Sequence, residues 1–320
     1  MKTFVALAAG VLLVASSCSE KVGVDFGEQS ALELNGRMAF DAAEGVKAWS
    51  AAKAATTKAE EVLGDLPATD LGVYVLTTAG KEATTDFSTT DWKNVAFVSD
   101  GAGNITNGAG AVTLKSGNTY DIYAYAPRVS DADLGAVDPG NVKLIPVNHG
   151  DDLLWAKTSG VVAKAKKTPV TLKFYHSGAQ IGFNIRMKDG GALVDPATSG
   201  VQLEVSGFYK KGVLDVETGK MTFKDADKDP DLVLSDFTGA KTTILVPSGD
   251  KLELSVKVTN VPGQDGKTFS GTLPLVANSG ESYLYDVNID TDSEGHSSIT
   301  FTATVEEWVP VEATTPVPIG

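Results

Sequence analysis

Polar and apolar residues alternate along much of this chain, so that every second side chain is hydrophobic. Four runs show the pattern most clearly, at positions 201–205, 252–258, 283–289 and 299–305. A period of two places alternate side chains on opposite faces of a β-strand, one face buried and the other in water. Turn sequences rich in Gly, Asp and Ser separate the runs. Many short alternating strands joined by such turns predict an all-β protein built of antiparallel β-sandwiches.

The alternation changes parity once, inside a long strand-like stretch. Val170 and Phe174 have even numbers, whereas Ile181 and Phe183 have odd numbers. A β-bulge or a sharp bend near Gly178 would keep the apolar side chains of both halves buried. We therefore expect the stretch to serve two domains, with the boundary at about residue 170. A chain of 320 residues has room for two domains of about 100–200 residues each.

Residues 46–63 form the one segment that suggests a helix, because they are rich in alanine, which favours helical backbone. The adjacent Thr56 and Thr57, and the lack of an apolar stripe with helical period, count against a helix. A helix and a partly extended segment therefore remain alternatives.

The N-terminus has the pattern of an export signal. Lys2 precedes an apolar run at 4–15, and small residues lead from that run to Cys18. The run is shorter than the roughly 20 apolar residues that span a bilayer, and its layout is typical of a secretory signal peptide. A cysteine directly after small residues resembles the lipobox of bacterial lipoproteins, so we predict a signal peptide at 1–17 and acylation of Cys18. An ordinary signal peptide that happens to contain a cysteine is the alternative.

Cysteine content and charge exclude several classes of function. Cys18 is the only cysteine, so no disulfide and no thiolate metal site can form within one chain. The chain carries 41 Asp and Glu against 27 Lys and Arg, a net charge of -14. Because an acidic surface repels phosphate groups, we expect no nucleic-acid partner.

No motif for catalysis or cofactor binding stands out. The sequence contains no nucleophile elbow, Walker loop, dinucleotide fingerprint or His-Glu-x-x-His, so we expect a protein that is not an enzyme and holds no cofactor. A glycosidase needs only two suitably spaced carboxylates, but no particular pair is indicated. His149, His176 and His296 lie far apart. A metal-binding or general-base role is one interpretation, and we favour a structural or solvent-exposed role.

Two acidic segments, 225–231 and 290–295, resemble calcium loops. The first has proline where an EF-hand loop has glycine, and the second has Phe301 in place of the bidentate carboxylate. We interpret both as solvated turns and predict no metal site, with calcium binding as the alternative. Exposed tryptophans can bind sugars, but isolated ones on strands more often pack in a core. The chain has four, at 49, 92, 155 and 308.

Five segments, in order along the chain, resemble the fimbrillin family of Bacteroidia, the subunits of donor-strand-assembled (type V) pili. They are Asp70–Val75, Asn118–Pro127, Asp151–Ala156, Leu172–Phe183 and Thr304–Trp308. The resemblance implies two tandem antiparallel β-sandwich domains of transthyretin-like topology, at 61–170 and 171–308. It also implies export as a lipoprotein to the outer membrane and cell surface, within a fimbrium.

In this family, a protease outside the outer membrane removes an N-terminal strand, and a strand of a neighbouring subunit fills the groove that remains. The resemblance therefore assigns residues 18–60 to a processed segment that contains the first strand. The best-studied members are cut after arginine. Arg37 lies in an alternating run and has the pattern of strand interior, whereas Lys53 and Lys58 lie in an Ala/Thr-rich segment better suited to a protease. These three are the candidate processing residues.

The C-terminal tail, residues 309–320, has the pattern of a donor strand. Its odd positions are mostly apolar and its three prolines, at 310, 316 and 318, are all even. Because the N–H groups of alternate residues point to the same edge, every missing donor lies on one edge of such a strand. The other edge keeps its full ladder and can add to a sheet. The candidate anchors are Val309, Val311, Val317 and Ile319; a frayed, proline-rich terminus is the alternative.

These observations predict a structural pilus subunit, of the shaft rather than the tip, because a shaft subunit must donate a strand. Its partners would be other copies of itself, other pilus subunits, a processing protease, and host or bacterial surface ligands. The second hypothesis is a surface glycan-binding lipoprotein of the outer membrane, which would show clustered exposed aromatic residues. A secreted hydrolase has no supporting motif.

Overall fold

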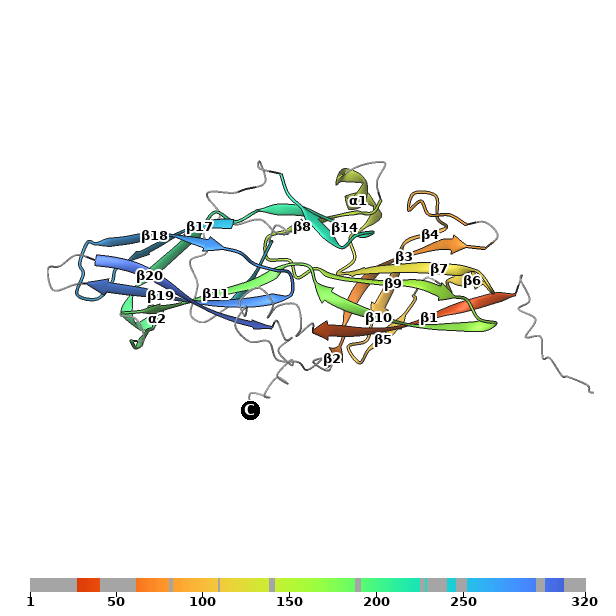
Figure 1. Ribbon diagram of the computed structural model, residues 1–320, viewed down its shortest axis with the longest axis horizontal. Helices are drawn as coiled ribbons and strands as arrows, with labels where there is room; N and C mark the ends of the chain where they lie inside the picture. Colours follow the sequence, from red (N-terminus) through yellow and green to blue (C-terminus); the bar gives the residue numbers. More distant parts are fainter. Residues whose placement is uncertain are drawn as a thin grey trace, which may run out of the picture.

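The computed structural model describes residues 28–40, 62–80, 83–108, 110–137, 142–187, 191–224, 228, 241–245, 252–291 and 297–307. Over these residues the chain is all-β, as the alternation predicts, with two short helices, α1 (Asp131–Val137) and α2 (Pro196–Ser199). The strands form two units placed end to end, so the molecule is elongated (Figure 1). Neither of the described helices is long and apolar enough to cross a membrane.

The N-terminal unit is a nine-stranded sheet that closes on itself. Its strands are β1 (Gln29–Phe40), β2 (Val62–Asp65), β3 (Thr69–Ala79), β4 (Trp92–Ser99), β5 (Asn104–Thr106), β6 (Thr113–Lys115), β7 (Thr119–Ala126), β9 (Leu154–Val162) and β10 (Lys166–His176). The order is β10-β9-β7-β3-β4-β5-β1-β2, with β6 beside β1 and β1 also beside β10. The pairing of β1 with β10 is parallel, which the alternation did not predict, and all other pairings in this sheet are antiparallel.

The closed sheet surrounds a hydrophobic core, called here the first core. Most of its strands contribute alternate side chains, because a pleated strand turns every second residue inward. Members from several strands are Leu34, Met38, Val73, Ile105, Ile122 and Phe174.

The C-terminal unit consists of two sheets that enclose a second core. One sheet contains β11 (Ala179–Arg186), β12 (Leu193–Val194), β16 (Lys241–Ile244), β19 (Glu281–Thr291) and β20 (Ser297–Glu307). The other contains β13 (Gln202–Ser206), β17 (Leu252–Thr259) and β18 (Thr268–Leu275). β17 shows the predicted alternation directly, since its even residues are buried and its odd residues are exposed or half-buried. β11 and β19 pair in parallel.

A fourth sheet, of three strands, links the two units. It consists of β8 (Leu144–Asn148), β14 (Lys211–Asp215) and β15 (Lys220–Thr222) and lies over the middle of the molecule (Figure 1). Its apolar residues, among them Ile145 and Leu214, pack with Tyr74 of β3 and Tyr125 of β7. Strands from both halves of the sequence therefore cover one outer face of the closed sheet.

The change of parity falls at the break between β10 and β11. Even residues of β10, such as Leu172 and Phe174, lie in the first core, whereas odd residues of β11, such as Ile181 and Phe183, lie in the second. Ser177 and Gly178 separate the two strands, and the Ser177 N–H donates to the Leu153 carbonyl at 2.7 Å. The reversal in the sequence thus marks the point where the chain leaves one sheet and enters another.

Of the two alternatives for 46–63, the helix is wrong at the C-terminal end, where Val62 and Leu63 begin β2 and pair with β1. Residues 46–61 lie outside the described residues. The described helices lie elsewhere, and α1 begins after Ser130, whose hydroxyl accepts from the Asp133 N–H at 3.2 Å. This is an N-cap, which offsets an unpaired amide of the first turn.

Candidate functional site

Strand β1 closes the N-terminal sheet. On one side it pairs in parallel with β10, from Ser30 opposite Lys166 to Met38 opposite Phe174. On the other side it lies against three short strands, β6, β5 and β2. Removal of β1 would open the closed sheet between β10 and these three strands.

The even-numbered face of β1 fills the first core. Leu32, Leu34 and Met38 are 8%, 4% and 0% exposed. Burial of a large aliphatic side chain stabilises a protein by about 1.5–3 kcal/mol, so these three contribute roughly 5–9 kcal/mol. That sum is comparable to the whole stability of a typical domain, about 5–15 kcal/mol. The groove beneath β1, called here the β1 groove, therefore requires a strand with apolar side chains to fill it.

Two positions of β1 lack a large apolar side chain. At one end, the buried hydroxyls of Ser30 and Thr168 lie 2.7 Å apart and share a hydrogen bond. At Gly36, a Cβ atom would lie 2.6 Å from Cδ2 of Leu66 and 2.9 Å from Cδ1 of Ile105. These distances are shorter than van der Waals contact, so the two side chains form a constriction at Gly36.

The odd-numbered face of β1 is at the surface. Glu33 accepts a hydrogen bond from Lys167 at 2.6 Å, and Arg37 pairs with Asp65 of β2. Exposed ion pairs of this kind contribute about 0–1 kcal/mol. Arg37 lies within a strand that is paired on both sides, whereas proteases cut exposed, unpaired chain most readily.

The other predicted site residues lie outside the described residues. These are Cys18, Lys53 and Lys58, and the tail anchors Val309, Val311, Val317 and Ile319. The segment 41–61 connects β1 to β2 and contains both lysines. Arg37 thus lies inside the strand that fills the groove, whereas both lysines follow that strand in the sequence.

The two described histidines, His149 and His176, have different partners. Nδ1 of His176 lies 2.7 Å from Oδ1 of Asp152, and the ring of His149 packs against Phe208 with centroids 5.2 Å apart. Burial lowers the pKa of His149. His296 lies outside the described residues, as does most of both acidic segments. Among the described residues, no group of three or more His, Cys, Asp or Glu side chains could hold a metal ion.

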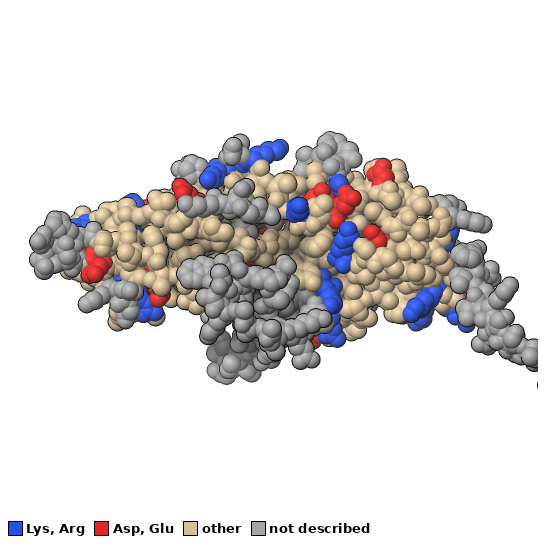
Figure 2. All heavy atoms as spheres, viewed as in Figure 1, with Lys and Arg blue, Asp and Glu red and all other residues tan. Residues whose placement is uncertain are grey.

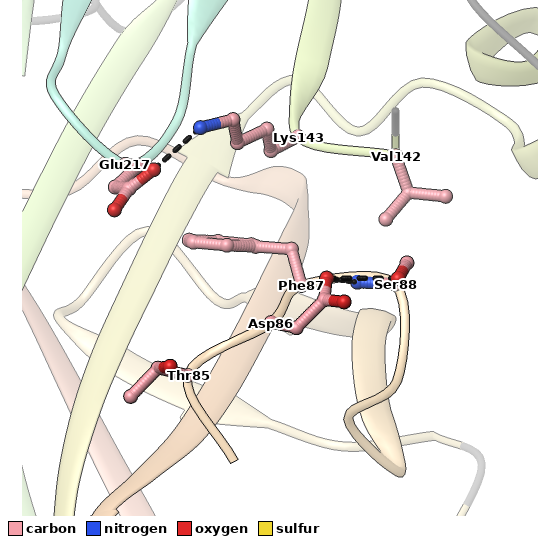
Figure 3. A pocket seen from close by; sticks show the side chains of 7 residues that line it. All are labelled: Thr85, Asp86, Phe87, Ser88, Val142, Lys143 and Glu217. Carbon is pink, nitrogen blue, oxygen red and sulfur yellow. Dashed lines mark hydrogen bonds and ion pairs between the residues drawn. The ribbon is translucent and has the colours of Figure 1, made fainter. Parts of the chain in front are cut away.

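A small pocket of about 290 Å³ lies between the loop at 85–88 and the start of β8 (Figure 3). Phe87 is its aromatic residue, but the Lys143 ammonium lies 5.9 Å from the centre of that ring. Lys143 also pairs with Glu217 and with Asp215. The Lys143 ammonium, held by both carboxylates, therefore covers one face of the ring and closes that face to a sugar.

The two described tryptophans are partly buried and pack against hydrophobic clusters. Trp92 packs against the first core. Nε1 of Trp155 donates to the Val216 carbonyl at 2.8 Å, and Gly219 lies so close to the indole that an added Cβ would be 2.9 Å from it. Charged residues of both signs are scattered over the face shown in Figure 2, rather than gathered in one patch. Tyr175 is the one aromatic among the exposed large hydrophobic side chains of the described residues, so the described surface shows no cluster of exposed aromatic residues.

Comparison with known proteins identifies the family. The family model for fimbrillin-like proteins matches residues 57–308. The chain belongs to the fimbrillin-like family. This confirms the resemblance drawn from the five sequence segments, and the matched residues extend from the segment before β2 through the whole C-terminal unit.

Solved structures of two Bacteroides proteins share the fold of this fimbrillin-like protein. A protein from Bacteroides ovatus, named for a role in cell adhesion, is 18% identical with a TM-score of 0.57, over 88% of this chain and 99% of that one. A similarly named protein from Bacteroides uniformis is 20% identical with a TM-score of 0.53, over 88% and 99%. The fimbrial anchor protein from Porphyromonas gingivalis is 12% identical with a TM-score of 0.42, over 88% and 98%. No curated protein sequence matches the chain.

Proposed function

We propose that this fimbrillin-like protein is a non-enzymatic shaft subunit of a cell-surface pilus and polymerises by donor-strand exchange. In this proposal the precursor is a lipoprotein acylated at Cys18 and delivered to the outer membrane. A protease then cuts near Lys53 or Lys58, β1 leaves, and residues 309–320 of a neighbouring subunit occupy the β1 groove. The proposal includes tandem β-sandwiches of transthyretin-like topology at 61–170 and 171–308.

The observation that carries the proposal is the position of β1. It is the first strand of the described chain, it closes the N-terminal sheet, and it contributes three buried apolar side chains to the first core. A single cut in 41–61 would separate it from every other strand. The sheet would then have an open apolar groove, which favours insertion of another strand because backbone donors and apolar side chains are both left without partners.

Membership of the family supports a role as a pilus subunit, and the pattern of the tail supports a place in the shaft. The alternating residues of 309–320 give one apolar face, and the parity of the prolines leaves one edge with a full set of N–H donors. Once β1 has left, the β1 groove lacks apolar side chains to fill the first core and a strand edge to hydrogen-bond with, and the tail offers both. A subunit that donates a strand as well as accepting one can extend a filament in both directions.

The decisive experiment compares filament formation with the stability of the subunit. Deletion of 309–320 should leave a folded protein that forms no filaments. Replacement of Val311 and Val317 by Asp should do the same, because a charge would enter an apolar groove. Replacement of Glu312 and Thr314 by Ala, on the opposite face, is the matched control and should leave filament yield near that of the wild type. Filaments from the truncated chain would contradict the proposed role of the tail.

Processing and lipidation are tested separately. N-terminal sequencing of protein sheared from the cell surface should find chains that begin between about residues 37 and 60, by analogy with the family and because proteases nick exposed chain most readily. A fatty-acid probe should label the wild-type precursor, and Cys18→Ala should abolish both the label and surface delivery. Surface protein that begins at Cys18 would instead indicate an anchored lipoprotein and favour the glycan-binding alternative.

A further inference from the structure

We infer that the tail of the neighbouring subunit enters the β1 groove antiparallel to β10, opposite in direction to β1, with Ala313 at the constriction beside Leu66 and Ile105. This inference rests on the proposed donor-strand exchange and adds to it a direction and a register. Two features of the described residues support it, namely the constriction at Gly36 and the edge to which each N–H of β1 points.

The constriction sets the register. A Cβ at Gly36 would lie 2.6 Å from Leu66 Cδ2 and 2.9 Å from Ile105 Cδ1, and both atoms are the far ends of flexible side chains. A methyl group can therefore enter after a small adjustment of Leu66 and Ile105, whereas a branched side chain cannot. Among the odd-numbered residues of the tail, which form its apolar face, only Ala313 is that small.

The edges of β1 are defined by its hydrogen bonds. The N–H groups of Leu32 and Gly36 donate to the carbonyls of Val112 and Gly103, both at 2.9 Å, on the side of β6 and β5. Inward-facing residues of β1 therefore point their backbone groups away from β10, and outward-facing residues point theirs toward β10. In a chain of L-residues, reversing the strand with the same face inward exchanges these two edges.

The prolines of the tail decide the direction. If the tail ran in the same direction as β1, its even positions would point toward β10. All three prolines, which lack an N–H, would then interrupt the hydrogen-bond ladder with β10, the longest in the groove. Run in reverse, the odd positions face β10 with every N–H present. The prolines then face the three short strands, whose pairing with β1 is already discontinuous. With Ala313 in the place of Gly36, Pro316 falls in the place of Glu33, where β1 has no pair on that side.

The register fixes the neighbours of each tail residue. In β1, Gly36 lies opposite Leu172 of β10, so Ala313 takes that position. In the reversed direction Thr314 then lies opposite Thr171, and Glu312 opposite Lys173. If the tail instead ran in the direction of β1, Glu312 would lie opposite Thr171 and Thr314 opposite Lys173. All four side chains face outward, and in the reversed direction they form non-hydrogen-bonded pairs, whose Cα atoms lie about 4.5 Å apart, within the range for a disulfide.

Disulfide trapping in filaments tests the direction. Full-length precursor is produced in cells with two added cysteines, and sheared filaments are oxidised and separated without reductant. We expect T171C with T314C, and K173C with E312C, to give covalent ladders of subunits. We expect T171C with E312C, and K173C with T314C, to give none. The four single-cysteine variants are the controls, since they carry each substitution without its partner.

The outcomes separate this inference from the proposed function. Ladders from the second two pairings alone would overturn the reversed direction while leaving donor-strand exchange intact. Filaments without ladders from any pairing would overturn both the inference and the role of the tail. An absence of filaments in the wild type would overturn the proposed function itself.

A substitution at the constriction tests the register independently. Ala313→Leu should lower filament yield about tenfold or more, because a large side chain would meet Leu66 and Ile105. Thr314→Leu adds bulk at the adjacent residue, whose side chain faces outward, and should leave the yield near that of the wild type. Equal yields from the two variants would overturn the placement of Ala313.

Discussion

The replacement Leu34→Ala should destabilise the precursor and leave the assembled filament unchanged. Leu34 is 4% exposed and belongs to the first core. Truncation of a buried leucine to alanine removes its transfer free energy and leaves a cavity, at a cost of about 2–5 kcal/mol. The matched control is Asn35→Ala, the next residue, which is exposed on the outer face of β1.

Denaturant unfolding of the uncut precursor measures the first half of this prediction. The Leu34 variant should lose about 2–5 kcal/mol relative to the Asn35 variant. Thermal dissociation of filaments measures the second half, and both variants should match the wild type there, because the proposed cut removes β1 from the mature subunit. A destabilised filament would mean that β1 stays in its groove. A precursor of unchanged stability would mean that β1 does not support the first core.

Three further predictions concern the rest of the fold. Tyr125→Phe removes a buried hydroxyl that donates to Oδ1 of Asn94 at 2.7 Å, and should cost about 1–3 kcal/mol in urea unfolding. Gly72→Ala should cost at least as much in the same measurement, because its Cβ would lie 2.3 Å from the Tyr125 ring. Burial lowers the pKa of His149 below its ordinary value of about 6.5 in the unfolded chain, so the unfolded chain binds the proton more readily and stability falls as pH falls below about 6.5. Unfolding midpoints between about pH 7.5 and about 5.5 should therefore shift less for His149→Gln than for the wild type.

Alternation in the sequence predicts strands well where both partners are near in the chain. β17 and β18 are joined by the turn at 261–267, and their residues pair in order across it. The change of parity between Phe174 and Ile181 likewise appears as the break between β10 and β11. These features depend on local pattern, because side chains two residues apart share a face whatever the strand pairs with.

The pairing of β1 with β10 could not be predicted in this way. Ser30 and Thr168, which share a hydrogen bond across it, lie 138 residues apart, and alternation is the same for parallel and antiparallel neighbours. The importance of Gly36 was equally hidden, because the constriction is made by Leu66 and Ile105 from other strands. The start of α1 did have a signal, since Ser130 and Asp133 have the spacing of a capped helix.

One continuous ribbon joins the two cores, and this has a mechanical consequence. β10 passes through Ser177 and Gly178 into β11, and each has a parallel neighbour, β1 for β10 and β19 for β11. Hydrogen bonds between strands run across the strand direction, so tension along the ribbon loads them together in shear instead of peeling them one by one. A pulling force on the strand in the β1 groove would therefore be transmitted along β10 and through Ser177 and Gly178 into the C-terminal sheet, so both units would bear the load.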